Sequence, residues 1–99
     1  MANFDLAMDS DGTRTQGKKV VTKADDYLAD VKELYELINS VDGVWKGVDN
    51  SEYTKKIGEY EQNIKSLGQV IGNYGVFMQE TANNYDKLQG EIASDASRI

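Results

Sequence analysis

Val44-Trp45-Lys46-Gly47 contains the only tryptophan of the chain and stands near the middle of its 99 residues. On each side of it, apolar residues recur at alternating steps of three and four, which is the spacing of one stripe along an α-helix. The stretch therefore predicts a chain reversal between two helices. The series before it is Val20, Ala24, Tyr27, Val31, Leu34, Ile38 and Val41. The series after it is broken in polarity only at Thr81 and is Tyr53, Ile57, Tyr60, Ile64, Leu67, Ile71, Tyr74, Met78, Thr81, Tyr85, Leu88 and Ile92.

Glycine and short polar residues interrupt the pattern between the two series. Gly47 can adopt the left-handed conformation that ends a helix. Asp49, with Glu52 three residues later, forms a candidate capping box for the next helix. The chain contains no proline, which suits long helices. We therefore expect an all-α, antiparallel helix-turn-helix hairpin with helices at about 10–44 and 50–94.

The two ends of the chain are less regular. Ser10 or Thr13 can cap the first helix, which we place from about Ser10. Residues 1–9 are expected to form an extended or flexible arm, and residues 95–99 a flexible tail. Positive side chains in the first turns oppose the helix dipole, so these turns should fray or depend on a partner. They are Arg14, Lys18, Lys19 and Lys23.

Two helices cannot enclose a hydrophobic core, so a second hairpin is expected to complete a four-helix bundle. The residues expected in the core and dimer seam are Val31, Leu34, Ile38, Ile57, Ile64, Leu67, Ile71, Tyr74 and Met78. A second stripe would face water in a single hairpin. Its members are Val21, Leu28, Tyr35, Val70 and Phe77.

Gly68, Gly72 and Gly75 lie on one face of the second helix, and Ala82 continues their row. Each glycine costs a helix about 1 kcal/mol relative to alanine, so a packing role is expected. Two interpretations stay open, close contact across a dimer and simple local flexibility.

The composition argues against a catalytic or metal-binding role for this chain. There is no histidine or cysteine, and the carboxylates are spread along polar faces, so no catalytic, cofactor or metal site is predicted. Asp9-Ser10-Asp11-Gly12 is a weak match to a calcium loop, because Val20 occupies the twelfth position, where a glutamate is needed. The net charge of -6 disfavours nucleic acid as a partner. No apolar run reaches the roughly 20 residues of a membrane span, and no signal-peptide pattern is present.

The chain resembles the WXG family, the small helical hairpins related to the early secretory antigen of mycobacteria and exported by type VII secretion systems. Trp45-Lys46-Gly47, the aromatic Tyr53 and the apolar heptads on both sides carry the resemblance. It implies a non-enzymatic, virulence-associated protein that forms a homodimer or a heterodimer with a related hairpin. It also implies export without a cleavable signal peptide, through contact with a secretion ATPase.

One part of the family pattern is altered. Family members carry a Tyr-x-x-x-Asp/Glu export signal after the second helix, near the partner's Trp-x-Gly turn. Here Tyr85 matches the tyrosine, but Gln89 stands at the acidic position, and the nearest acids are Asp86 and Glu91. Either Tyr85 acts with a displaced acid, or a partner carries the signal. The departure resembles members from Gram-positive bacteria outside the mycobacteria.

Trp45 and Gly47 then have two possible roles, which can coexist. The indole can plug the end of the bundle, or it can form a docking patch with Tyr85 of the other chain. The leading hypothesis is a secreted binding module. The alternatives are an export chaperone for a larger helical toxin or effector, and an intracellular coiled-coil adaptor.

Overall fold

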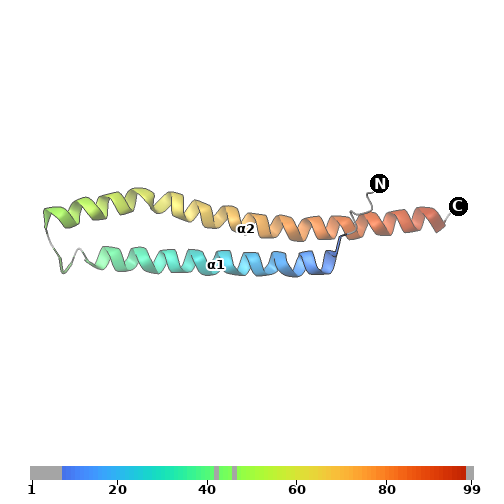
Figure 1. The fold of residues 1–99 in the computed structure, drawn as a ribbon, viewed down its shortest axis with the longest axis horizontal. Helices are drawn as coiled ribbons and strands as arrows, with labels where there is room; N and C mark the ends of the chain where they lie inside the picture. Colours follow the sequence, from blue (N-terminus) through green and yellow to red (C-terminus); the bar gives the residue numbers. More distant parts are fainter. Residues whose placement is uncertain (1–7, 42, 46, 98–99) are drawn as a thin grey trace.

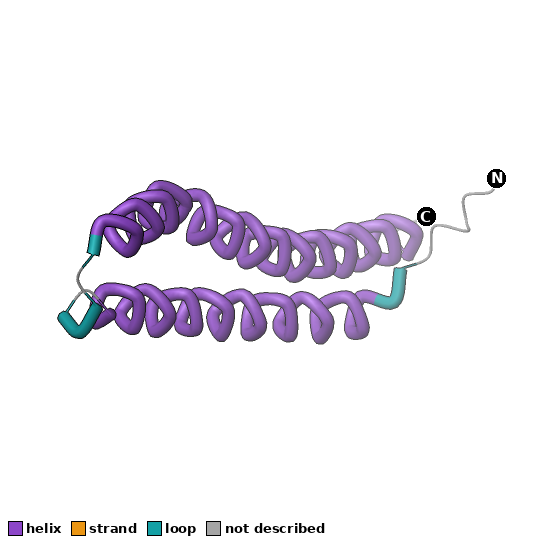
Figure 2. The backbone as a smooth tube through the Cα atoms, turned by 60° about the vertical axis from the view of Figure 1, so that its left-hand side comes forward, coloured by secondary structure: helices purple, strands orange, loops and turns teal. Residues whose placement is uncertain are grey.

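The computed structural model describes residues 8–41, 43–45 and 47–97. Within these residues the chain forms two helices and no strand: α1 (Ser10–Val41) and α2 (Val48–Ser97). The helices run antiparallel, side by side, in a rod of 78 × 22 × 16 Å (Figure 1 and Figure 2). The prediction of an all-α chain with two long helices is confirmed. Most of the predicted arm, residues 1–7, lies outside the described residues.

Asp9 begins α1. Its side-chain Oδ1 accepts a hydrogen bond from the Gly12 amide at 2.9 Å, and its carbonyl accepts one from the Thr13 amide at 2.9 Å. The start at Ser10 agrees with the prediction, but the cap is Asp9 and neither Ser10 nor Thr13. An aspartate suits this position because it satisfies a free helical N–H and places negative charge at the positive end of the helix dipole.

The connection differs from its predicted form. α1 ends at Val41, whose carbonyl accepts the Trp45 amide at 2.8 Å, and no described residue has a positive φ. The prediction of a left-handed Gly47 is therefore wrong. Gly47 instead precedes α2, and its carbonyl accepts the Ser51 amide at 3.1 Å, which makes it the N-cap. Position 49 already lies inside α2, one residue after the helix begins, so it is not the N-cap that was predicted.

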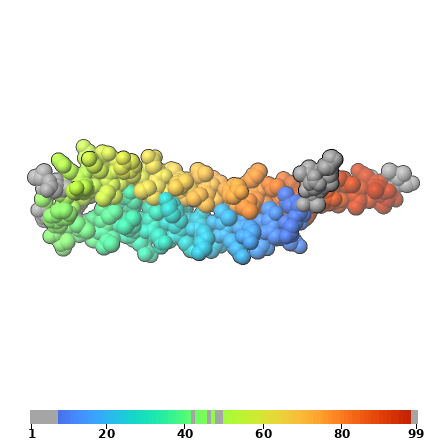
Figure 3. Space-filling view, viewed as in Figure 1, coloured from blue at the N-terminus to red at the C-terminus, as the bar shows by residue number. Residues whose placement is uncertain are grey.

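α2 is 50 residues long and α1 is 32, so α2 projects beyond the start of α1 (Figure 3). It continues past the predicted end at residue 94, and residues 95–97 of the predicted tail are helical. The sequence contains no glycine or proline after Gly90 that would end the helix earlier. Residues 98–99 lie outside the described part.

Small residues hold the two helices together. A Cβ atom added at Gly75 would lie 2.7 Å from the carbonyl oxygen of Gly17, and one added at Gly17 would lie 2.8 Å from that of Gly75. The two backbones are thus in direct contact. Buried residues recur every seven positions on each helix: Gly17, Ala24 and Val31 on α1, and Gly68, Gly75 and Ala82 on α2.

This contact decides the role of the glycine row. Gly68 lies against the side chains of Tyr27 and Leu28, and Gly72 faces the Cβ of Ala24. The row therefore packs on α1 of the same chain, and the interpretation as a contact across a dimer is wrong for this face. Glycine fits because it lets two helices approach until their backbones touch.

Two tyrosines close the gap nearer the connection. The Tyr27 hydroxyl donates to the Ile64 carbonyl at 2.9 Å, and the Tyr35 hydroxyl donates to the Ile57 carbonyl at 2.8 Å. Tyr35 is 5% exposed, so the prediction that it faces water is wrong. Its hydroxyl reaches across to the α2 backbone at Ile57, in the part of the helix where the glycine row has ended.

We expect Gly75→Ala to destabilise the fold by about 1–3 kcal/mol, the cost of overpacking a closed contact. The new methyl group would lie 2.7 Å from the Gly17 carbonyl oxygen and 3.0 Å from the backbone nitrogen of Val21, and neither atom belongs to a flexible side chain. The matched control is Gly58→Ala in the same helix, where a Cβ has no neighbour within 4 Å. The control should gain up to about 1 kcal/mol from helix propensity. Urea unfolding at one protein concentration measures the free energy of unfolding of both variants. Equal stabilisation of the two would contradict the close contact between Gly17 and Gly75.

Candidate interaction surface

α2 carries a row of exposed apolar side chains beside the buried glycine row. Leu67 directly precedes Gly68, and Tyr74 directly precedes Gly75, so each is turned about 100° from its buried neighbour. Leu67 is 54% exposed and Tyr74 is 60% exposed. Tyr53 and Tyr60 extend the same row at heptad spacing and are also exposed. Most of the predicted seam on α2 therefore lies on a flank of the hairpin, outside its internal contact.

α1 contributes to the same side. Tyr27 spans from α1 to the Ile64 carbonyl, so its heptad neighbour Leu34 lies on the flank that Ile64 borders. Leu34 is half exposed, whereas Val31 is buried inside the hairpin and Ile38 is partly buried. We call the combined surface the apolar face. Its members are Leu34, Tyr53, Ile57, Tyr60, Ile64, Leu67, Ile71, Tyr74 and Met78.

The accessible surface shows that a single hairpin is incompletely buried. The chain exposes 7503 Å² at a mass of 11.0 kDa. A compact monomer of that mass exposes about 5,600 Å². The excess of about 1,900 Å² exceeds the roughly 800 Å² that each partner buries in an interface of standard size. The excess belongs to the whole elongated chain, and the apolar face is one part of that exposed surface.

The central part of α2 is apolar on more than one side. Residues 66–79 contain no charged side chain, and Val70 and Phe77 are exposed on the side away from α1, as predicted. A shallow groove of about 240 Å³ lies between the helices, lined in part by Val21, Leu28, Gly68, Gly72 and Val76. This segment thus offers apolar surface beyond the apolar face.

Trp45 lies at the connected end of the hairpin. Asn50 is buried, and its Nδ2 donates to the Trp45 carbonyl at 2.8 Å, which fixes the backbone there. The indole remains 51% exposed, and a Cβ at Gly47 would lie 3.8 Å from its Nε1. Lys46 lies outside the described residues. Asn50 was not singled out from sequence, where it looked like an ordinary residue of a polar turn.

Tyr85, Asp86 and Glu91 lie toward the opposite end of the same chain. Asp86 accepts a hydrogen bond from Arg14 Nη2 at 2.6 Å, and Arg14 Nε donates to Asn83 Oδ1 at 2.9 Å. Asp86 therefore ties α2 to the first turns of α1, which are helical and held within the chain. Tyr85 is partly buried, and Glu91 is exposed on the projecting part of α2. The structure does not bring Trp45 and Tyr85 of one chain together.

The described residues offer little for other kinds of site. Across 8–41, 43–45 and 47–97, no three acidic, histidine or cysteine side chains are grouped to hold a metal ion. A search of the same residues finds no helix with the length and apolar character needed to span a membrane.

Hydrogen bonds from the Ser10 hydroxyl and from Arg14 lower the pKa of Asp86 below its ordinary value of 3.8. A depressed pKa stabilises the folded state above the unfolded pKa, and this contribution is lost as the pH falls through the lower folded value. We expect the Asp86 carboxyl to titrate below 3.8 in an NMR titration and to return toward 3.8 in Arg14→Ala. An unchanged midpoint in that variant would contradict the ion pair between Arg14 and Asp86.

Comparisons with known proteins leave the family open. No protein-family model matches the chain, and neither a curated protein nor a solved structure matches it.

Proposed function

We propose that the chain is a non-enzymatic binding protein of the WXG type, which pairs through its apolar face into a four-helix bundle and is exported by a type VII secretion system. The partner is a second copy or a related hairpin. The observation that carries the proposal is the apolar face itself, with Leu67 and Tyr74 more than half exposed on a chain that buries too little surface alone.

Pairing through this face would give each helix a second neighbour. The glycine row already occupies one side of α2 with α1, and the apolar face stands beside it. Helical bundles bury such flanking rows between hairpins, which encloses a core that two helices cannot enclose. The half-exposed Trp45 at the connected end is the proposed docking residue for the secretion ATPase, because aromatic anchors dominate such contacts.

A second candidate function is export chaperone for a larger helical protein. Val70 and Phe77 favour it, because they lie on the side of α2 away from α1 and outside the apolar face. A pair formed through the apolar face alone would leave them in water. A chain isolated from its native cells in complex with a larger helical protein would support this candidate.

We expect Leu67→Lys to break the pair, because it places a charge in the middle of the apolar face. The native chain should have twice its 11.0 kDa mass in light scattering, and the variant should have a single chain's mass. Gln69→Lys is the matched control, since Gln69 is exposed in the same segment but lines the groove between the helices. A native chain of monomeric mass at micromolar concentration would refute pairing with itself.

The variant Trp45→Ala distinguishes a docking role of Trp45 from a role in folding. Because the indole is half exposed, we expect the variant to keep its helical circular dichroism and its mass in light scattering. In a host with a type VII system it should remain in the cells, while the native chain reaches the culture medium. Loss of folding would instead assign Trp45 a structural role, and normal export would refute the docking role.

A further inference from the structure

The outer side of α1 is turned away from α2, and its basic and acidic residues lie in different halves of the helix. Lys19, Asp26 and Glu33 each lie two residues after a buried residue, about 200° around the helix, so they point away from α2. Thr15, Thr22 and Ala29 lie two residues before the same buried positions and complete the stripe. All members of this stripe are exposed. We call it the outer stripe of α1: Thr15, Lys19, Thr22, Asp26, Ala29 and Glu33.

The two halves of α1 have opposite charge. No acidic residue occurs between Gly12 and Ala24, where Lys18, Lys19 and Lys23 lie. From residue 25 to 36 the helix carries Asp25, Asp26, Asp30, Glu33 and Glu36, with Lys32 as the single base. None of Lys18, Lys19 and Lys23 has a carboxylate partner among the described residues.

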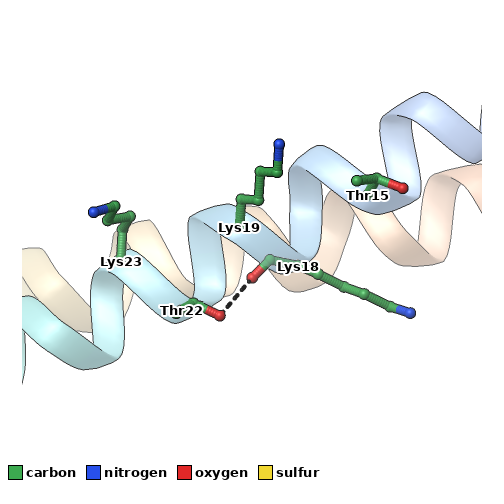
Figure 4. A pocket seen from close by; sticks show the side chains of 5 residues that line it. All are labelled: Thr15, Lys18, Lys19, Thr22 and Lys23. Carbon is green, nitrogen blue, oxygen red and sulfur yellow. Dashed lines mark hydrogen bonds between the residues drawn. The ribbon is translucent and has the colours of Figure 1, made fainter.

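Figure 4 shows the basic half with α2 behind it. A shallow hollow of about 330 Å³ is lined by Thr15, Lys18, Lys19, Thr22 and Lys23. The Thr22 hydroxyl donates to the Lys18 carbonyl at 3.1 Å, and this hydrogen bond holds the Thr22 side chain against its own helix. Three of the five lining residues are lysines, so the hollow suits a partner that brings carboxylates.

We propose that the outer stripe of α1 binds the outer stripe of a second copy, antiparallel and around a twofold axis at Asp26. In this register Lys19 of one copy is level with Glu33 of the other, while Asp30 and Glu36 lie about one and two residues along the helix from the levels of Lys23 and Lys18. The residues beside the outer stripe also face residues of opposite charge. Lys23 and Asp30 lie on one side of the stripe, and Lys18 and Glu36 lie on the other. Charge complementarity of this kind fixes register and orientation.

This contact is separate from the apolar face and does not depend on the proposed function. The outer stripe lies on the far side of α1 from α2, and it stays exposed whether or not the apolar face is paired. The two contacts differ in character, since the outer stripe is polar and charged. Exposed charges are screened when the Debye length falls from about 30 Å at 10 mM salt to about 8 Å at 150 mM.

The register also contains an unfavourable element. The two Asp26 carboxylates meet at the axis, and like charges placed opposite one another oppose association. Asp26→Asn should therefore strengthen the contact, whereas it would have no effect if α1 bound elsewhere.

Sedimentation velocity at about 10 mM and about 150 mM salt tests the proposal. The native chain should form a species of twice the mass found at high salt, with the association constant falling about 10-fold as salt is added. A dimer at high salt would then become a tetramer at low salt, and a monomer would become a dimer. The mass at high salt shows whether the chain pairs through the apolar face, and the doubling at low salt shows whether it pairs through the outer stripe. The failure of either contact is therefore seen separately.

Charge reversal supplies the decisive comparison. The double variants Lys18→Glu/Lys19→Glu and Glu33→Lys/Glu36→Lys should each lose the low-salt species, and their equimolar mixture should recover it. Lys55→Glu/Lys56→Glu is the matched control, because it makes the same charge change at exposed positions of α2. No low-salt species in the native chain, no recovery in the mixture, or equal loss in the control would overturn the proposal. Sedimentation of the native chain with phosphatidylserine vesicles in place of self-association would also overturn it.

Discussion

The backbone contact between Gly17 and Gly75 sets the geometry of the whole hairpin. It fixes how near the helices lie and which side of each helix is turned inward, because only glycine leaves room for a carbonyl of the opposite helix. Once those two sides are fixed, the 3.6-residue period places every other side chain. Leu67 and Tyr74 then fall on a flank, since each stands one position before a residue of the buried row.

Much of the architecture followed from the sequence. The three-four spacing on both sides of Trp45 predicted two long helices, and the polar, glycine-containing break between them predicted the reversal. The caps were harder, because Asp9, Ser10 and Thr13 are all competent N-caps and only the hydrogen bonds of the Asp9 side chain select one. Gly47 was predicted to end the first helix in a left-handed conformation, but its carbonyl caps the start of α2 and this requires no positive φ.

The inward side of the helices could not be predicted from hydrophobicity. The largest apolar stripe, with Leu67 and Tyr74, is the expected core of a two-helix chain, yet the internal contact uses glycine and alanine. Close approach of backbones gains packing along the whole contact, whereas bulky side chains would hold the helices apart. Gly17 was overlooked for the same reason, because one glycine early in a helix gives no periodic signal by itself.

The projecting part of α2 has a consequence for local stability. Beyond Asp86, which Arg14 ties to α1, residues 87–97 continue as a single helix with exposed Leu88 and Ile92. A helix of that length is marginal alone, but here it extends an existing helix and avoids the cost of nucleation. Its helical content therefore depends on the turns that precede it. Undocking of α1 at Arg14 would be transmitted along the backbone to the C-terminal end, which makes that end a local reporter of whether the hairpin is closed.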